Sequence, residues 1–308
     1  MRKIKVAVIG VGYLGEFHAQ KYKNNKNVDL IGVVDIDKQR CDEISNKLNV
    51  TPYYNYKKII NEIDAVSIVV PTNLHYKLAK YFIENNKHVL IEKPFTKDIK
   101  EARKLKKISN DKKIILQIGH VERFNNAFSK LQTMVKKPLF IECNRISPFK
   151  IRGTEVDVIM DLMIHDLDII LSLNKTKIKN IQAKGINVLT NTADIANARI
   201  TFENNCICNL SSSRISDKVE RKMRVFQKNE YFSLDYQNSV LDYYKKLKGK
   251  RIMNIEKKQY KFTKNDSLNK EIESFIKCIK YNKNPIVNSN DGLNALKYSL
   301  QISKLIKK

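Results

Sequence analysis

Carboxylates and one imidazole recur at helical spacing in the segment 156–173. They follow one another at steps of four, four and three residues, so a helix would carry all of them on one face: Asp157, Asp161, His165 and Asp168. His165 with a carboxylate one turn earlier suits general-base catalysis, because Asp161 would orient the imidazole and stabilise its charged form. A metal site is a poorer interpretation, since no second nitrogen ligand is nearby. The alternative is that these side chains have no catalytic role and are either solvated or hydrogen-bonded within the protein.

Lys93 is the second side chain whose position suggests chemistry. It follows an apolar run in the segment Glu92-Lys93-Pro94, and the proline favours an extended backbone at Lys93. A lysine at the end of a strand can polarise a substrate hydroxyl or bind an anion. The alternative is an ordinary surface lysine, in a chain that contains many of them.

A glycine-rich turn near the N-terminus predicts a nucleotide-binding loop. The β-branched run 4–9 leads into G-x-G-x-x-G, formed by Gly10, Gly12 and Gly15. Gly10 permits a tight turn, Gly12 lets the backbone approach a pyrophosphate, and Gly15 lets the next helix pack closely on the strand. The amino end of that helix would offer unpaired N–H groups and a positive dipole to phosphates.

An acidic residue after the next strand completes this motif. Asp35 lies twenty residues after Gly15, where a carboxylate would bind the ribose hydroxyls of a dinucleotide. A carboxylate there would repel a 2′-phosphate, so Asp35 favours NAD over NADP. Lys38 and Arg40 follow closely and weaken that preference.

The first 120 residues alternate between strand and helix patterns, which predicts a parallel sheet covered on both faces. The expected strands are Ile4–Ile9, Val28–Val34, Ala65–Val70, His88–Glu92 and Lys113–Ile118. The expected helices are Leu14–Lys23, Lys38–Leu48, Tyr56–Asn61, Leu74–Asn85 and Ile99–Ser109. Ligands of such sheets bind at the carboxyl ends of the strands, so the segments 71–75, 92–94 and 119–125 should gather beside the glycine loop.

From Pro138 onward the pattern changes to strands joined by short turns, which indicates an antiparallel sheet. The expected strands are Leu139–Ile146, Ile178–Val188, Ile195–Glu203, Ile207–Ile215, Lys222–Gln227 and Tyr231–Tyr236. The expected helices are Val156–Leu173, Leu268–Tyr281 and Gly292–Ile306, the last capped by Asn290 or Asp291. The sequence therefore predicts an α/β protein. A Rossmann dinucleotide-binding domain would span residues 1–123, and an α+β domain with an open antiparallel sheet would span residues 124–308.

Composition limits the class of protein. The 308 residues suffice for two domains, and no apolar run is long enough for a membrane span. The first strand begins within four residues, which leaves no room for a signal peptide. The five scattered cysteines are typical of reduced thiols, so we expect a cytoplasmic protein without a metal site.

The formal net charge of +26 fits either an anionic partner or lysine-rich solvated surfaces. Lysines are interleaved with apolar positions at helical spacing, which favours solvated surfaces. The basic run 245–251 is typical of a loop or hairpin that could touch a membrane surface. No DNA- or RNA-reading motif accompanies it, so we expect no nucleic-acid partner.

These motifs together resemble the glucose–fructose oxidoreductase, inositol dehydrogenase and MocA family. The resemblance covers nearly the whole chain and rests on the combination, in order, of the glycine loop with His18, Pro71-Thr-Asn-Leu-His75, Glu92-Lys93-Pro94 and Asp161-Leu-Met-Ile-His165. It implies that Lys93 and His165 flank the substrate hydroxyl and the nicotinamide, with Asp161 assisting. The expected cofactor-binding residues are Gly10, Gly12, Tyr13, Leu14, Gly15, Asp35, Pro71, Thr72, Asn73, His75, Glu92 and Lys93.

Within the family, the chain is most similar to the UDP-N-acetylglucosamine 3-dehydrogenase branch, which serves diaminosugar synthesis for lipid A. That similarity rests on the segments 119–125, 144–149 and 156–168; the branch tends to have proline at the position of Asn126. It implies a nucleotide-sugar substrate, a downstream aminotransferase and a homo-oligomer, dimeric or tetrameric. Candidates to hold the pyrophosphate by charge-assisted bonds are Arg123, Asn125, Arg145 and Arg152.

Two other functions stay open. Related members oxidise free sugars or polyols such as inositol, for which pyrophosphate-binding arginines would be unnecessary; each arginine could equally form a structural salt bridge. Some relatives bind the cofactor without turnover and act as regulators, although the presence of both Lys93 and His165 speaks against this.

Overall fold

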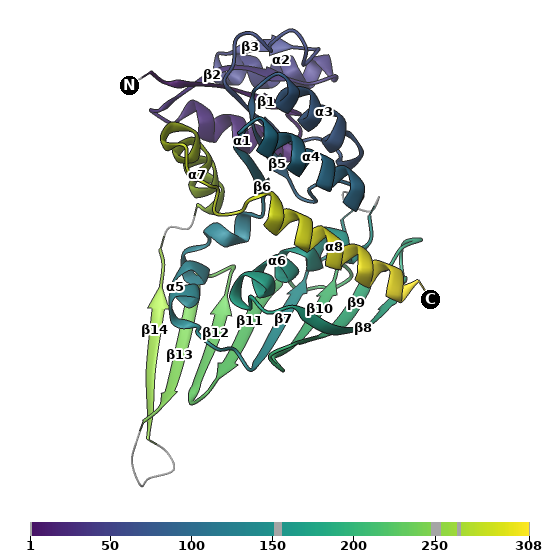
Figure 1. The fold of residues 1–308 in the computed structure, drawn as a ribbon, viewed down its shortest axis with the longest axis vertical. Coiled ribbons are helices and arrows are strands. Elements are labelled where there is room, and N and C mark those ends of the chain that lie inside the picture. Colours follow the sequence, from purple (N-terminus) through teal and green to yellow (C-terminus); the bar gives the residue numbers. More distant parts are fainter. Residues whose placement is uncertain (1, 151–155, 248–253, 264–265, 308) are drawn as a thin grey trace. The chain divides into compact units, whose positions relative to one another are not determined.

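The computed structural model describes residues 2–150, 156–247, 254–263 and 266–307 (Figure 1). The chain forms two compact units, one of Met1–Val121 with Leu268–Leu293 and one of Glu122–Ser267 with Asn294–Lys308. A short 3-10 helix, η1 (Val121–Phe124), lies where the chain first passes between them. The segment Leu268–Leu293, which the sequence pattern assigned to the second domain, thus packs within the first unit.

Six parallel strands form the sheet of the first unit, in the order β3-β2-β1-β4-β5-β6. The strands are β1 (Ile4–Ile9), β2 (Val28–Val34), β3 (Thr51–Tyr53), β4 (Ala65–Ile68), β5 (His88–Glu92) and β6 (Leu116–Gly119). The strand order reverses between β1 and β4, and open parallel sheets bind ligands at the carboxyl ends beside such a reversal. The strand β3 is an addition to the predicted set, too short and too polar to be recognised from its pattern.

Helices cover both faces of this sheet: α1 (Tyr13–Lys23), α2 (Lys38–Leu48), α3 (Thr72–Glu84), α4 (Ile99–Asp111) and α7 (Ser267–Tyr281). One apolar cluster joins β1 and β2 to α1, α2 and α7 through side chains such as Tyr22, Ile44 and Phe275. The predicted helix Tyr56–Asn61 is wrong, because that segment forms successive turns. The amide of Lys58 donates to the carbonyl of Asn55, three residues back, as in a turn rather than an α-helix.

Eight strands form the sheet of the second unit, in the order β14-β13-β12-β11-β7-β10-β9-β8. They are β7 (Phe140–Ile146), β8 (Ile178–Ile186), β9 (Ile195–Phe202), β10 (Ile207–Ser213), β11 (Glu220–Gln227), β12 (Glu230–Asp235), β13 (Val240–Lys246) and β14 (Ile255–Lys261). The sheet is mixed, because β7 and β10 run parallel while the other neighbours are antiparallel. Of the basic run 245–251, the first residues end β13, which pairs with β14, and residues 248–251 lie outside the described residues.

Only one face of this sheet is fully covered. Along β7 and β9 buried positions alternate with more exposed ones, as expected for a sheet with one covered face. The covered face packs against α5 (Asn126–Met134), α6 (Ile164–Leu173) and the later part of α8 (Ser289–Ile306), and their apolar residues form one cluster (Figure 1). The helix α5 and the strands β13 and β14 were not predicted from the sequence.

The predicted helix Val156–Leu173 begins as a π-helical segment, Ile159–Met163, before α6. The carboxylate of Asp157 accepts from the amide of Met160 and so caps this segment. A π-helix holds more residues per turn than an α-helix, so steps of four residues no longer return to one face. The single polar stripe predicted for this helix is therefore wrong: Asp157 and Asp168 are buried, while Asp161 and His165 are half-buried.

The last helix, α8, begins earlier than predicted and has a different cap. The side chain of Asn288 accepts from the amides of Asn290 and Asp291, and the Asp291 carboxylate accepts in return from the Asn288 amide. Three backbone donors at the start of the helix are thus satisfied, two by Asn288 and one in return by Asp291, in the manner of a capping box. The cap is Asn288, rather than Asn290 or Asp291.

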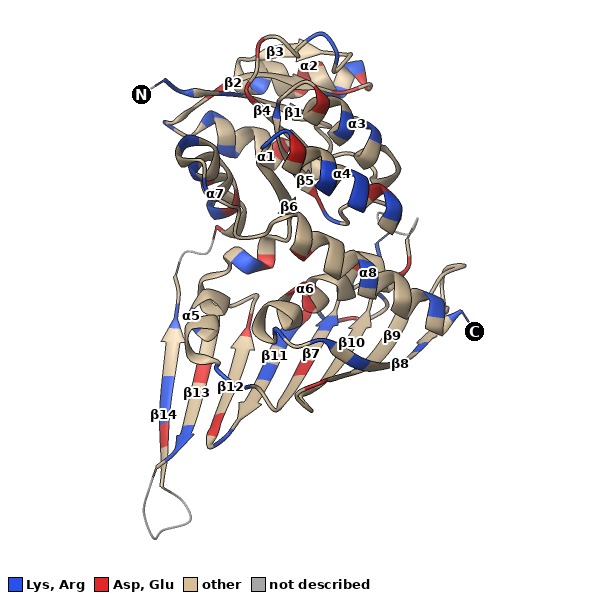
Figure 2. Ribbon diagram, viewed as in Figure 1, with Lys and Arg blue, Asp and Glu red and all other residues tan. Residues whose placement is uncertain are grey.

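Lys and Arg are spread over the helices of the first unit and the strands of the second (Figure 2). They lie mainly at solvent-facing positions of amphipathic elements, which is where sequence periodicity placed them. Within the described part of the chain, none of the helices combines the length and the apolar composition that crossing a membrane requires.

Candidate active site

The glycine loop joins β1 to α1 at the carboxyl end of β1. Gly10 has a φ of +87°, and a Cβ at this position would lie 2.3 Å from the carbonyl oxygen of Val69. A Cβ at Gly15 would lie 1.9 Å from the carbonyl oxygen of Gly10, whereas a Cβ at Gly12 would meet nothing within 4 Å. The loop is therefore closed toward the protein and open beside Gly12, which fits the approach of a dinucleotide pyrophosphate.

Asp35 is fixed beside this loop. One carboxylate oxygen accepts from the amide of Val11 at 2.8 Å, and the other accepts from the amide of Asp37 at 3.0 Å. Each carboxylate oxygen has a second lone pair, which can accept from a ribose hydroxyl. The geometry fits the ribose-binding role predicted for Asp35.

Exposed apolar side chains surround the same loop. Ile36 is 89% exposed directly after Asp35, and Tyr13 and Leu14 are 62% and 42% exposed at the start of α1. Exposed apolar groups beside a binding loop are candidates to cover flat apolar parts of a ligand. Ile36 is not part of the glycine motif, so the sequence analysis missed it. The sequence feature that could have indicated it is an apolar β-branched residue between two aspartates, just beyond the end of a strand.

The Glu92-Lys93-Pro94 segment follows β5, and its Lys93–Pro94 peptide bond is cis. The Glu92 carboxylate lies 3.1 Å from Nε2 of His18, a side chain of α1 that is buried. A Cβ at Gly119 would lie 2.9 Å from the Glu92 carboxylate, so the glycine that ends β6 leaves room for it. Burial acts to raise the pKa of Glu92, but the hydrogen bond and charge of His18 outweigh it and lower that pKa.

The segment Pro71–His75 approaches Glu92-Lys93-Pro94 from the neighbouring strand. Pro71 immediately precedes α3, and Thr72 and Asn73 form its first turn. The buried ring of His75 lies 2.8 Å from the carbonyl oxygen of Pro94 and 2.9 Å from that of Val70. Burial lowers the pKa of His75, so the neutral ring donates to one of these carbonyl groups at a time. His75 thereby ties the Lys93 segment to the end of β4.

These contacts bring together the residues predicted to lie beside the glycine loop in the first unit. Gly10 contacts Val69, His75 contacts Pro94, and Glu92 contacts both His18 and the surroundings of Gly119. The prediction holds because all four segments follow parallel strands of one sheet.

In the second unit, Asp161 lies within the π-helical segment and His165 is the second residue of α6. The segment entering this helix is anchored by Arg214, whose Nη1 donates to the carbonyl of Val156 at 2.7 Å. Arg214 is itself held by the buried carboxylate of Asp194 at 2.9 Å. π-helical segments occur often at functional sites, which fits the position of Asp161 within this one and of His165 two residues after it.

The arginines predicted to bind a pyrophosphate are engaged within the second unit. Arg145 is buried and makes a bidentate pair with Asp166, with N–O distances of 3.1 Å and 2.9 Å, and a third bond to Glu122 at 2.9 Å. Arg123 is buried with its Nε 3.1 Å from the carboxylate of Asp168. Because carboxylates already neutralise both guanidinium groups, direct pyrophosphate binding would leave buried carboxylates unpaired.

Burial alone would lower the pKa of Arg145, but the nearby carboxylates of Asp166 and Glu122 outweigh it and raise that pKa. Burial is also the larger influence on Asp166 and raises the pKa of that carboxyl group, against the lowering effect of Arg145. The arrangement is a buried ion-pair network that holds β7, η1 and α6 together.

Asn125 also serves the fold of this unit. Its side-chain oxygen accepts from the amides of Ala127 and Phe128 and so caps α5, while its side-chain nitrogen donates to the carbonyl of Tyr236. Arg152, the fourth predicted substrate-binding residue, lies outside the described residues. The three described candidates therefore all make contacts that hold elements of the second unit together.

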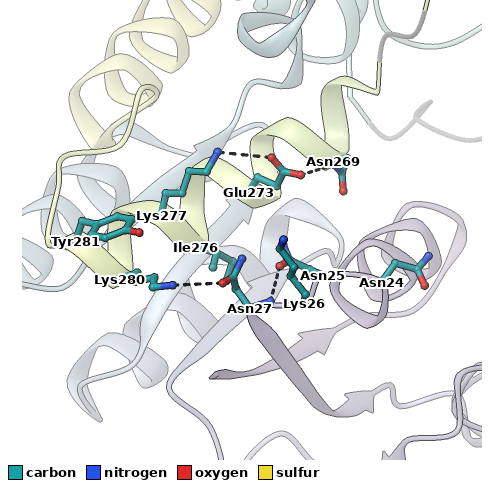
Figure 3. A pocket seen from close by; sticks show the side chains of 10 residues that line it. All are labelled: Asn24, Asn25, Lys26, Asn27, Asn269, Glu273, Ile276, Lys277, Lys280 and Tyr281. Atoms are coloured by element: carbon teal, nitrogen blue, oxygen red, sulfur yellow. Dashed lines mark hydrogen bonds and ion pairs between the residues drawn. The ribbon is translucent and has the colours of Figure 1, made fainter. Parts of the chain in front are cut away.

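A separate pocket of about 470 Å³ lies between the loop 24–27 and α7 (Figure 3). Polar side chains that line it bind one another: Lys277 pairs with Glu273 at 3.7 Å, and Lys280 contacts the side chain of Asn27 at 3.3 Å. The loop 24–27 precedes β2, so the pocket lies at the amino end of that strand, away from the glycine loop. Among the residues that the structure describes, no three His, Cys, Asp or Glu side chains lie close enough to hold a metal ion.

Two family models match the chain. Residues 4–120 match an oxidoreductase family with an NAD-binding Rossmann fold, and residues 147–231 match the GFO/IDH/MocA C-terminal domain. These matches agree with the parallel sheet of the first unit and with the mixed, mostly antiparallel sheet of the second. NAD is the cofactor of this fold, and the residues around Gly12 and Asp35 fit it.

Comparisons with individual proteins agree with the two family models. A UDP-N-acetylglucosamine 3-dehydrogenase from Acidithiobacillus ferrooxidans is 36% identical over 305 residues, which is 98% of this chain and 97% of that protein. Its crystal structure superposes with a TM-score of 0.93 over 100% of this chain and 99% of the other. A myo-inositol 2-dehydrogenase from Thermotoga maritima is 25% identical over 95% of this chain and 93% of that protein. A scyllo-inositol dehydrogenase from Lactobacillus casei, solved with bound NAD(H) and scyllo-inositol, shares the fold with a TM-score of 0.83 at 18% identity, over 99% of this chain and 97% of the other.

Proposed function

The chain belongs to the glucose–fructose oxidoreductase, inositol dehydrogenase and MocA family of NAD-dependent oxidoreductases, and from this premise we propose that it oxidises the 3-hydroxyl of UDP-N-acetylglucosamine or a related UDP-sugar to a 3-keto sugar. The observation that carries the proposal is the full-length similarity to a dehydrogenase with that name. The motifs that the sequence shares with that branch support the same substrate.

Lys93 and His165 are the proposed catalytic residues. When bound, NAD supplies the hydride acceptor. One ring nitrogen of His165 would accept the proton of the substrate hydroxyl, with Asp161 stabilising the imidazolium that forms. The ammonium group of Lys93 would donate a hydrogen bond to the oxygen as negative charge develops on it. On the protein side, the contacts of Glu92 and His75 would hold the Lys93 segment in place.

A free sugar or polyol is the second candidate substrate. The observation that favours it is the pairing of Arg123 and Arg145 with carboxylates, which removes two of the groups expected to bind a pyrophosphate. Named relatives among the inositol dehydrogenases are consistent with this substrate class, at lower identity.

We further propose that the 3-keto product is consumed by an aminotransferase, in diaminosugar synthesis for lipid A or a surface polysaccharide. A ketone is the group that such an enzyme converts to an amine. The five cysteines are all free and buried, which supports the cytoplasm, where thiols stay reduced, as the proposed location.

We also propose a homo-oligomer, dimeric or tetrameric, that uses the less covered face of the eight-stranded sheet. Neighbouring aromatic rings from β7, β11, β12 and β13 form a row with centroid separations of 5.9, 4.8 and 5.3 Å: Phe140, Phe226, Tyr231 and Tyr244. They alternate with core side chains such as Val225 and Phe232, so they lie on the opposite face from α5 and α6. A row of apolar rings on that face supports an interface there.

The test is to incubate pure protein with NAD and a panel of substrates, and to follow NADH formation. The panel contains UDP-N-acetylglucosamine, other UDP-sugars, free N-acetylglucosamine and myo-inositol. We expect turnover with the UDP-sugars, increased by an aminotransferase and glutamate that remove the ketone. Turnover confined to myo-inositol would instead establish the second candidate.

Variants of the two proposed catalytic residues test the mechanism. His165→Asn should lower kcat by a factor of about 10² to 10⁴, because general bases contribute that much. Lys93→Met should lower it by about 10² to 10³, the usual cost of removing one donor to a developing negative charge. Both variants should bind NADH as the parent does, which shows that they are folded. Near-parental kcat in either variant would contradict the role assigned to that residue.

A further inference from the structure

A cation lies close to Asp35, at a place where many dinucleotide-binding proteins recognise a 2′-phosphate. Arg40, on the first turn of α2, donates from Nε to the carbonyl of Val11 at 3.0 Å. The amide of the same Val11 is held by Asp35 at 2.8 Å. Arg40 and Asp35 thus bind the carbonyl group and the amide group, respectively, of one residue in the glycine loop, Val11. An arginine near that acidic position is the type of side chain that accommodates the 2′-phosphate of NADP.

Each terminal nitrogen of Arg40 also donates a hydrogen bond to a carboxylate. Its Nη2 lies 2.6 Å from Glu16, and its Nη1 lies 2.9 Å from Glu43. The two partners differ in environment: the side chain of Glu43 is 62% exposed, whereas that of Glu16 is 18% exposed. Exposed surface pairs contribute little, so Glu16 is the partner that fixes the guanidinium.

Glu16 is itself held in a charged and ordered state. It directly follows Gly15, and its other oxygen accepts from Lys47 at 2.6 Å and from Gln20 at 3.0 Å. The hydrogen bond from Lys47 is the largest influence on Glu16 and lowers the pKa of its carboxyl group. The carboxylate of Glu16 is therefore a second negative charge beside the glycine loop, on the first turn of α1.

We propose that Glu16 is a specificity-determining residue that excludes NADP, acting together with Asp35. A 2′-phosphate at this position would meet the carboxylate of Glu16 and would find Arg40 already paired. Asp35 repels the phosphate directly, and Glu16 withholds the guanidinium of Arg40, which could otherwise compensate. Removal of Asp35 alone therefore leaves Arg40 paired, and removal of both carboxylates frees it. The inference depends only on NAD as the cofactor and is independent of the sugar that is oxidised.

The experiment measures dissociation constants of NADH and NADPH by the fluorescence of the reduced nicotinamide, which needs no substrate. The variants are Asp35→Ser, Asp35→Ser with Glu16→Gln, and the same pair with Arg40→Met. We expect the double variant to bind NADPH about tenfold more tightly than Asp35→Ser does, which corresponds to about 1.4 kcal/mol. The added Arg40→Met should remove that gain, because the gain requires the freed guanidinium.

Glu43→Gln in the Asp35→Ser background is the matched control, since Glu43 contacts the same guanidinium from an exposed position. We expect it to change the NADPH dissociation constant by less than about threefold. The circular dichroism spectrum and the thermal midpoint report whether each variant is folded, since Asp35→Ser is itself expected to weaken NADH binding. Equal NADPH affinity of folded Asp35→Ser and double variant would overturn the proposal. A gain that survives Arg40→Met, or an equal gain from Glu43→Gln, would overturn it as well.

Discussion

Burial decides what the charged side chains of this protein can do at the scale of single residues. Arg145 and Arg224 both lie on the mixed sheet and both pair with carboxylates, but the side chain of Arg145 is 3% exposed and that of Arg224 is 48% exposed. A buried arginine that bridges two carboxylates cannot be exchanged for water, whereas an exposed one can. The exposed fraction of the arginine side chain, which the residue type does not reveal, therefore distinguishes a structural ion pair from a surface pair.

Arg145→Met should lower the free energy of unfolding by about 3 to 5 kcal/mol, because it leaves the carboxylates of Asp166 and Glu122 buried and unpaired. Arg224→Met, the control, should cost less than about 1 kcal/mol. Urea denaturation followed by circular dichroism measures both. A small effect of Arg145→Met on stability, together with a large loss of UDP-sugar affinity, would contradict the structural role and restore the predicted pyrophosphate contact.

Capping and strand contacts act at the scale of the elements. The reciprocal hydrogen bonds of Asn288 and Asp291 set the start of α8, and the exposed Asn290 only donates its amide. Both asparagines lie next to Ser289 in the sequence, so composition alone does not distinguish the cap from its neighbour. The distinction comes from the backbone geometry at which the helix begins.

Asn288→Ala should lower the free energy of unfolding by about 0.5 to 2 kcal/mol through loss of the cap. Asn290→Ala, two residues later, should change it by less than about 0.5 kcal/mol, as for most surface substitutions. Thermal unfolding of the three proteins provides the comparison. Equal losses in the two variants would be evidence against Asn288 as the cap.

The pairing of β5 with the segment before β6 depends on a neutral histidine. Nδ1 of His88 accepts from the amide of Ile115 at 3.0 Å, and burial lowers the pKa of His88. A histidine whose pKa is depressed in the folded state stabilises the protein above its ordinary pKa of 6.5, and this contribution is lost as the pH falls through the lower folded-state pKa. Stability should therefore decrease between pH 7 and about pH 5.

His88→Asn tests this origin, because the asparagine oxygen can accept from the same amide without titrating. The variant should lose less stability than the parent between pH 7 and about pH 5, with urea midpoints at each pH as the measurement. His75, whose pKa burial also lowers, is present in both proteins and contributes to the decrease they share. Parallel pH profiles would rule out His88 as the source.

Charge and assembly belong to the scale of the whole molecule. Lys and Arg of the described residues, which contribute to the net charge of +26, lie on many helices and strands of both units (Figure 2). A net charge of this size opposes association, so an oligomer requires apolar contact to offset the repulsion. The aromatic row from Phe140 to Tyr244 is the surface proposed to provide it.

Phe226→Asp with Tyr231→Asp should convert the proposed oligomer to a smaller species, because two carboxylates would be desolvated in the interface. Size-exclusion chromatography with light scattering gives the mass of each protein at equal concentration. Lys107→Glu, at an exposed position of α4, is the control and should retain the parental mass. The interface would be refuted by a monomeric parent, or by a folded double variant that keeps the parental mass.

The sequence by itself determined most of the strands and helices of the first unit, with the exceptions of β3, the segment 56–61 and the placement of α7, and the residues that lie at the carboxyl edge of its sheet. Period-two and period-3.6 patterns report which side chains are buried, and the glycine loop, Asp35, His75 and Lys93 all follow parallel strands. The carboxyl ends of such strands meet at one edge whatever the details of packing. Proximity along that edge could therefore be predicted.

Tertiary structure decided which polar groups have partners. Spacing placed Asp157, Asp161, His165 and Asp168 on one helical face, but a π-helical segment redistributed them. The arginine candidates met carboxylates of η1 and α6, and Arg40 met Glu16 from another helix. Charge pairing depends on distances between residues far apart in the chain, and local periodicity carries no information about those distances. For the same reason the return of α7 to the first unit emerged only from the folded chain.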